Sequence, residues 1–276
     1  MDVELFVIQV ASLFLEPKDL LQSLIQRFSL ERHLGMVSGD EQHSSDDSDG
    51  EDLIPVYGSC LEDFLLLLIA LINNRNPFLP TRDEEGEIET EIIQTLFLGP
   101  CSHSKLDKHL PSRLTENPGF ESVLKRVSDF KYPLRLEDQG TYTLKSSFIE
   151  KIQPYYHHYN PKDRSLVEEK LKQHGKSGGS KSNSSKSPLI LPPVISHSPV
   201  FSSKNLDSIV CCERFMDLLS TCLSRTSCAS SADTLETSII YDNLIDIVLY
   251  LILMSSQEME FHHIIPDNIQ MILSVS

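Results

Sequence analysis

The sequence predicts a mainly α-helical protein that contains one short β-hairpin. Apolar residues recur at three-or-four spacing along much of the chain, and near residue 140 this period changes to two. Hydrophobic residues make up 40% of the 276 positions, which is enough to build cores without disulfide bonds. The length allows one large domain or two modest ones.

Three short helices and a hairpin are predicted between residues 88 and 144. The first helix has an apolar stripe and ends at Gly99-Pro100, where glycine suits a left-handed cap and proline lacks an amide hydrogen. The stripe consists of Ile88, Ile92, Ile93, Leu96 and Phe97. Ser104 is expected to cap the second helix, which should bury Leu106 and Leu110.

The third helix and the hairpin complete the order of a winged helix. Asn117 and Pro118 suit the cap and the first position of the third helix. Its apolar side is predicted to hold Phe120, Val123, Leu124, Val127 and Phe130. The hairpin is predicted to pair Leu134 and Leu136 with Tyr142 and Leu144 across Asp138-Gln139-Gly140.

The rest of the chain is expected to form helices that polar linkers connect. The linkers are rich in Ser and Asp or in Ser, Lys and Pro, and have too little apolar surface to offset the entropy of ordering them. The predicted division is 1–37 as an N-terminal helical hairpin, 38–59 as an acidic disordered linker, 60–160 as a lead helix plus the winged-helix domain, 161–174 as a polar helix, 175–204 as a Ser/Lys/Pro-rich linker and 205–276 as a C-terminal helical pair. Within these parts, helices are expected over 3–15, 19–28, 61–73, 165–173, 206–223 and 235–254.

The net charge of −16 argues against nucleic acid as a partner, because binding to phosphates needs clustered Lys and Arg. Lys125, Arg126, Lys131 and Arg135 nevertheless keep an independent nucleic-acid-binding regulator as the alternative function. From Glu87 to Lys151, ten acidic residues stand against nine basic ones. A winged helix that contacts protein is therefore the preferred interpretation.

The sequence also favours a cytoplasmic protein without a membrane partner. The first residues are acidic where a secretion signal would be basic. The apolar runs at 64–72 and 244–254 are shorter than the roughly 18 to 20 residues that a membrane span requires. The six cysteines are then expected to stay reduced.

Candidate metal ligands do not form a recognised pattern. The cysteines are Cys60, Cys101, Cys211, Cys212, Cys222 and Cys228, and no two of them form a Cys-x-x-Cys pair. The pairs His157-His158 and His262-His263 hold adjacent residues, which point about 100 degrees apart on a helix. Asp47-Ser48-Asp49-Gly50 lacks the glutamate that closes a calcium-binding EF-hand loop, because Val56 stands there. We expect no metal site and no cofactor in this segment.

Catalytic residues are not predicted either. His103, Ser104 and Asp107 are the residue types of a hydrolase triad, but they belong to one short helix instead of converging from separate elements. Ser44 and Ser48 each have an acidic residue three positions later, so phosphorylation by an acidophilic kinase is a hypothesis for both.

Several short segments, in their order along the chain, resemble the middle region of the UBR-family E3 ubiquitin-protein ligases, the N-recognins. They are Asp2-Val3, Ala11-Ser12-Leu13, Leu61 to Phe64, Glu91 to Leu96, His103 to Leu106, Gly140 to Lys145 and Tyr155 to Tyr159. The specificity lies in this order over most of the chain. The third vertebrate paralogue or a close relative is the expected member.

The resemblance implies a fragment of a much longer ligase. Family members join a zinc-bearing UBR box, which binds destabilising N-terminal residues of substrates, to a RING domain that docks a ubiquitin-loaded E2. This chain has neither module, so zinc is expected only in the parent and the segment alone is expected to be inactive. The implied role is a scaffold that positions substrate recognition relative to the RING in N-degron-type protein degradation. Its implied partners are the other domains of the parent and, through them, the E2 and protein substrates.

Overall fold

The structure is a computed structural model, and it describes residues 2–31, 34, 54–74, 83–133, 135, 139–177, 206–229 and 235–261. Most of the two predicted linkers, including Ser44, Ser48 and the EF-hand-like residues, lies outside these ranges, as do Leu134, Leu136 and His262-His263. The chain divides into two compact units. The helical unit comprises Met1–Arg75 and Val194–Ser276, and the winged-helix unit comprises Asn76–Pro193.

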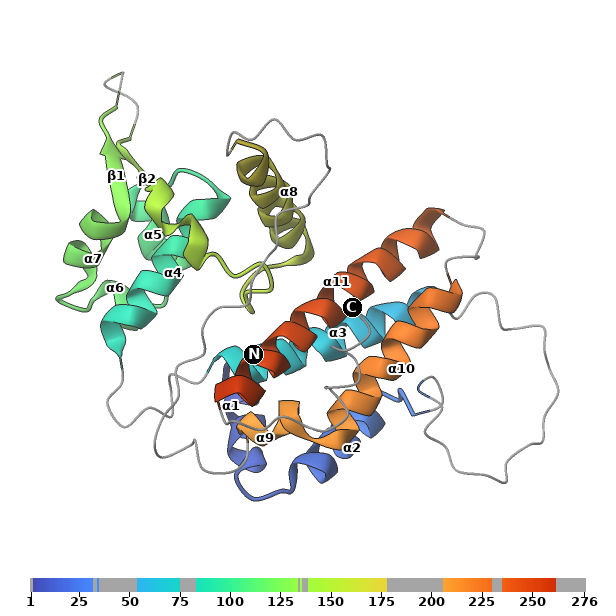
Figure 1. Ribbon diagram of the computed structural model, residues 1–276. Helices are drawn as coiled ribbons and strands as arrows, with labels where there is room; N and C mark the ends of the chain where they lie inside the picture. The colour runs from blue at the N-terminus through green and yellow to red at the C-terminus, as the bar shows by residue number, and fades with distance from the viewer. Residues whose placement is uncertain are drawn as a thin grey trace, which may run out of the picture. The chain divides into compact units, whose positions relative to one another are not determined.

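The helical unit is built around two long apolar helices. Helix α3 packs along α11, and α10 packs beside α11 (Figure 1). The remaining helices α1, α2 and α9 pack against this group. The bounds are α1 Asp2–Ser12, α2 Pro17–Arg27, α3 Ile54–Asn73, α9 Leu206–Cys211, α10 Glu213–Ala229 and α11 Leu235–Phe261. Because α3 is covered on several sides, its side chains from Phe64 to Ile72 are almost all buried.

The structure groups α3 differently from the predicted division. The division of the sequence joined the lead helix to the winged helix in 60–160, whereas α3 belongs to the helical unit and packs on α11. It also begins at Ile54, inside the stretch predicted as linker 38–59. The predicted helix 206–223 is interrupted at Cys212, and α11 continues beyond residue 254 to Phe261.

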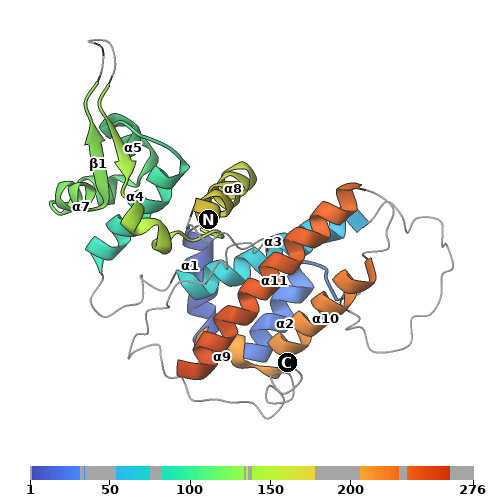
Figure 2. The ribbon, with the colours of Figure 1, turned by 45° about the horizontal axis from the view of Figure 1, so that its top comes forward.

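The winged-helix unit contains the predicted order of three helices and a hairpin, with short additions. Strand β1 lies beside α7 (Figure 2), and β2 packs against α4. The bounds are α4 Glu84–Leu98, α5 His103–His109, α6 Ser112–Thr115, α7 Phe120–Val127, β1 Ser128–Lys131, β2 Thr141–Leu144, the 3-10 helix η2 Ser146–Lys151 and α8 Pro161–Ser177. The mainly α fold with a winged helix is therefore confirmed.

One continuous core holds this unit together. The whole predicted stripe of α4 is buried, as are Leu106 and Leu110 around α5, and all of them join the same cluster. The buried face of α7 consists of Phe120, Val123, Leu124 and Val127. Val167 of α8 and Ile152 complete the cluster, so the polar helix is part of this unit.

The hairpin starts earlier than predicted. Strand β1 pairs antiparallel with β2, and Phe130 stands opposite Tyr142 where the sequence suggested a helical Phe130 and a strand at Leu134. The chain leaves α7 directly into β1, and the Ser128 hydroxyl donates to the carbonyl oxygen of Leu124 at 2.5 Å. Gly140 lies against the Phe130 ring, since a Cβ there would meet Cζ of Phe130 at 2.2 Å.

Two helix starts also differ from the predicted caps. Helix α5 follows Ser102 instead of Ser104, and α7 follows Gly119 instead of beginning at Asn117-Pro118. The Asn117 side chain accepts a hydrogen bond from the Gly119 amide at 2.8 Å, in the turn just before α7. In the part of the chain that the structure describes, no helix is both long and apolar enough to cross a membrane.

Candidate protein-binding site

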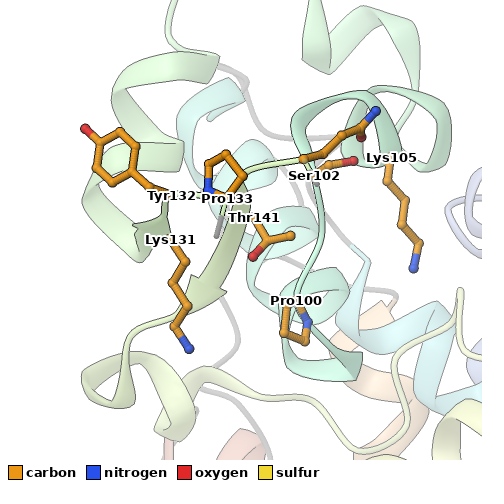
Figure 3. A pocket seen from close by; sticks show the side chains of 8 residues that line it. Pro100, Ser102, Lys105, Lys131, Tyr132, Pro133 and Thr141 are labelled. Atoms are coloured by element: carbon orange, nitrogen blue, oxygen red, sulfur yellow. The ribbon is translucent and has the colours of Figure 1, made fainter. Parts of the chain in front are cut away.

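A shallow hollow lies on the winged-helix unit, between the start of α5 and the hairpin. It has a volume of about 810 Å³ and is lined by Pro100, Ser102, Lys105, Lys131, Tyr132, Pro133, Gln139 and Thr141. Figure 3 shows Lys131 and Lys105 on either side of the hollow, with Thr141 and Pro100 between them. The isolated bridge between Cys101 and Tyr142 brings the α4–α5 connection beside β2, which assembles these segments.

The chemistry of the hollow suits binding and not bond-making. Its lining offers two ammonium groups, hydroxyl and amide side chains and the exposed ring of Tyr132, and it contains no carboxylate. Exposed aromatic rings, such as that of Tyr132, are enriched at surfaces that contact other proteins. The hollow is therefore the candidate protein-contact site of this unit.

Arg126, at the end of the third helix, is already paired with acidic residues of α4. Its guanidinium lies 2.8 Å from Oε2 of Glu89 and 3.3 Å from Oε2 of Glu85. These carboxylates raise the pKa of Arg126. Burial would raise the pKa of Glu89, but hydrogen bonds from Lys151 and Arg126 outweigh it and lower that pKa. Arg126 thus joins α7 to α4, and the two carboxylates already balance its charge.

Two lysines likewise bind backbone at the ends of helices. Nζ of Lys145 donates to the carbonyl oxygens of Lys125 and Arg126 at 2.9 and 2.8 Å. Nζ of Lys170 donates to those of Phe97 and Leu98 at 2.8 and 2.9 Å. A cation is favourable at a helix C-terminus, where carbonyl groups lack intrahelical partners. All four basic residues weighed for DNA, Lys125, Arg126, Lys131 and Arg135, are exposed, and Arg126 is in addition paired with two carboxylates of α4.

A buried carboxylate holds the segment after η2 against α4. Glu91 is only 8% exposed, and its Oε1 accepts a hydrogen bond from the Tyr156 hydroxyl at 2.5 Å. Nδ1 of His158 lies 3.2 Å from the same oxygen. Burial alone would raise the pKa of Glu91, but hydrogen bonds from His158 and Tyr156 lower it below its usual value. Burial and the nearby Glu91 raise the pKa of Tyr156.

Gln94, one turn further along α4, makes a second set of contacts to the same segment. Its amide nitrogen donates to the carbonyl oxygen of Lys151 at 3.0 Å, and its amide oxygen accepts from the backbone nitrogen of Gln153 at 3.1 Å. The Tyr159 hydroxyl donates to that oxygen at 3.0 Å. The Tyr155 to Tyr159 segment is therefore fixed by buried polar contacts and serves structure.

The residues of the possible hydrolase triad do not converge. Nε2 of His103 lies 2.7 Å from Oε1 of Glu121, while the Ser104 hydroxyl lies within 3.2 Å of Ser102 and 3.4 Å of Gln139. No nucleophile–base pair forms among them. Within the described residues, no three His, Cys, Asp or Glu side chains gather as metal ligands would. That this segment holds no zinc stays a prediction.

Sequence reasoning missed the buried roles of Glu91 and Gln94. Both lie on the inward side of α4, between the apolar residues Ile88 and Phe97, where a polar residue signals a buried partner. The only feature of the sequence that indicated buried roles for Glu91 and Gln94 was their position within the apolar stripe of α4. Which hydroxyl or amide they would meet could not be known without the path of residues 151–159.

The fold defines a winged-helix domain that carries a candidate protein-contact site and is joined in one chain to a helical unit. Residues 87–186 match the winged-helix domain of the family described as E3 ubiquitin-protein ligase UBR1-like. The chain is 29% identical over 267 residues to E3 ubiquitin-protein ligase UBR2 of Mus musculus, a match that covers 95% of this chain and 14% of that relative. The winged-helix unit is therefore similar to that of the UBR-type E3 ubiquitin-protein ligases, and similarity to one such ligase extends over 95% of the chain.

Other relatives match a little over three fifths of the chain. E3 ubiquitin-protein ligase UBR1 of Drosophila melanogaster is 30% identical over 177 residues, covering 61% of this chain and 9% of the relative. The ubr1 ligase of Schizosaccharomyces pombe is 29% identical over 181 residues, covering 63% and 9%. The chain thus spans about a tenth of the length of these relatives. Its assignment to the third vertebrate paralogue stays a prediction.

Proposed function

We propose that this chain is a scaffold segment of a UBR-type E3 ubiquitin ligase, which positions substrate recognition relative to the module that recruits the E2. The observation that carries the proposal is the winged helix itself, whose Arg126, Lys145 and Lys170 are engaged in internal contacts. A winged helix that uses its cations in this way is suited to holding shape. The similarity to E3 ubiquitin-protein ligase UBR2 indicates that the reaction to which this shape contributes is ubiquitin transfer.

The contribution of such a segment is geometric. A RING-type ligase accelerates transfer by bringing the acceptor lysine close to the E2 thioester, and this gain comes from proximity and orientation. The described residues supply rigid packing and a contact surface, and the E2 keeps the bond-making step. The segment alone is proposed to be inactive, with zinc confined to other modules of the ligase and with substrates of the N-degron type.

An exchange experiment tests the proposal. In mouse UBR2, the homologous segment is replaced by this chain, and substrate ubiquitylation is measured with purified proteins at equal concentration. The chimera is expected to keep at least about a third of the rate, because a scaffold that shares the fold preserves the spacing of the modules. A matched chimera that carries Leu124→Asp, at a position of α7 buried in the winged-helix core, is expected to lose most of the ubiquitylation rate.

Two results would contradict the proposal. One is a chimera that folds, as judged by a cooperative thermal transition, but ubiquitylates no substrate. The other is discharge of a ubiquitin-loaded E2 by the isolated chain in a single-turnover assay, since this would place catalytic chemistry inside the segment.

A further inference from the structure

Helix α1 exposes apolar side chains on its outer side. Val3 is 73% exposed and Val7 59%, and the two lie one helical turn apart on one side of α1. Phe14, just beyond the helix, is 82% exposed. Of the ten exposed large hydrophobic residues in the described chain, six lie between Val3 and Leu15. We call Val3, Phe6, Val7 and Phe14 the outer face of α1.

The inner side of the same helix is partly polar and fixed in place. Leu5, Gln9 and Ser12 are buried there. Nε2 of Gln9 donates to the carbonyl oxygens of Leu71 and Asn74, at 3.0 and 2.6 Å, at the end of α3. The outer face could turn inward only if these bonds broke and left buried polar groups unpaired.

A helix that buries polar groups and leaves apolar side chains exposed is typical of an interaction surface. Solvent exposure of the four apolar side chains of the outer face costs free energy that a partner would recover on binding. The helix geometry therefore indicates an interface, and the charges around it indicate what binds there.

We propose that the outer face of α1 docks an amphipathic helix of another protein segment, with Lys or Arg beside its apolar stripe. Residues 1–17 contain no basic side chain, whereas Glu4 and Glu16 are acidic. A basic flank would complement these carboxylates. A second copy of the chain would bring like charges together, and an anionic lipid surface would be repelled in the same way.

This surface can be tested on the chain alone, so its failure would leave the proposed scaffold role standing. If the chain works inside a longer ligase, the remaining sequence of that ligase is one source for the docked helix. The match to mouse UBR2 includes 95% of this chain but only 14% of that relative, so most of such a ligase lies outside this segment.

Binding is measured with the full chain and a fluorescent designed helix of about four turns, with Leu at coiled-coil a and d positions and Lys beside them. Two control peptides have the same length: one shuffles the order to remove the stripe, and one replaces Lys by Glu. At physiological ionic strength, the Leu/Lys helix is expected to bind at least about tenfold more tightly than either control.

Variants of the chain locate the site. Val3→Ser with Val7→Ser is expected to weaken binding about tenfold or more, because both side chains would be buried in the complex. Val7→Thr keeps the branched shape and is expected to weaken binding severalfold with an unchanged melting temperature. The matched control is Leu249→Ser, at an exposed apolar position of α11 in the same unit, which should change binding less than about twofold.

Four results would overturn the inference. They are equal binding of the shuffled peptide, equal loss of binding in the Leu249→Ser control, concentration-dependent dimerisation that Val3→Ser with Val7→Ser abolishes, and flotation with phosphatidylserine vesicles that the same double variant abolishes. The third result would assign the outer face to a second copy of the chain, and the fourth to a membrane surface.

Discussion

Helices α7 and α1 both carry apolar residues at helical spacing, but those of α7 are buried in its own unit, whereas several of those on α1 are exposed. In α7, Phe120, Val123, Leu124 and Val127 are all buried in the winged-helix core. In α1, Val3 and Val7 face solvent while Gln9 and Ser12 are buried. The apolar face of α7 is therefore used for folding of its own unit, and that of α1 is left for another protein segment.

The largest expected effect is a cavity in the core below α7. Leu124→Ala removes a fully buried side chain and is expected to lower the free energy of unfolding by about 2–5 kcal/mol. The measurement is urea denaturation followed by circular dichroism. In α1, Val7→Ser should change the same quantity by less than about 0.5 kcal/mol. Similar losses for both variants would break the comparison between the two helices.

Removing the charge of Glu91 is expected to have the next largest effect. Glu91→Gln weakens the hydrogen bonds from Tyr156 and His158. It should lower the free energy of unfolding by about 1–3 kcal/mol near neutral pH. Tyr156→Phe, which removes one donor and keeps the ring, provides the matched comparison. Equal stability of wild type and Glu91→Gln at neutral pH would show that this buried network does not support the fold.

The pH dependence of that loss follows from the lowered pKa of Glu91. A carboxyl whose pKa is lower in the folded protein stabilises it above the pKa of the unfolded chain, and this stabilisation is lost as pH falls through the lowered folded pKa. Wild type should therefore lose its advantage over Glu91→Gln in the acid range. Denaturation curves of both proteins between neutral and acid pH test this, and a constant difference would contradict it.

A smaller effect is expected at the exposed link between α7 and α4. Arg126→Ala removes contacts to Glu85 and Glu89. Because these groups are partly exposed to water, the free energy of unfolding should fall by at most about 1 kcal/mol. The loss should shrink at high salt because the ions screen the pair. Thermal melts in low and high salt provide the measurement, and a loss that grows with salt would be inconsistent with it.

The smallest expected effect is on nucleic acid. The chain should pass through a duplex-DNA column at low salt, and Lys125→Glu with Arg126→Glu should leave its elution unchanged, because the chain carries a charge of −16 and Arg126 is paired internally. Salt-dependent retention that the double variant abolishes would restore the nucleic-acid-binding alternative.

The sequence predicted those parts of the fold that repeat a local pattern. The stripe of α4 and the apolar side of α7 needed only helical spacing, and both are buried as predicted except for Phe130, which lies in β1 and is exposed. The strand was misplaced because Phe130 continues the spacing of α7, while its pairing with Tyr142 is a contact between distant residues. The start of α3 and its partner α11 depend on tertiary packing, which local composition does not encode.

The candidate site was less predictable than the fold. Of the two lysines of the hollow, only Lys131 was among the four basic residues weighed for DNA. The position of Lys105 across the hollow depends on the Cys101–Tyr142 bridge. The pairing of Arg126 with Glu85 and Glu89 likewise depends on how α7 packs on α4. Residues from separate helices and strands meet only in the folded structure, so the pattern of residue types along the sequence does not predict these contacts.

The proposed positioning role of the chain is tested most directly by measuring two reactions separately, in the chimera in which this chain replaces the homologous segment of mouse UBR2. Residues 83–177 are replaced there by a Gly/Ser linker, and two rates are measured: ubiquitylation of a bound substrate, and discharge of the loaded E2 to free lysine. If the segment acts as a positioning scaffold, substrate ubiquitylation is expected to fall by about tenfold or more, while discharge to free lysine is expected to stay within about twofold. Equal loss of both rates, or loss of neither, would contradict it.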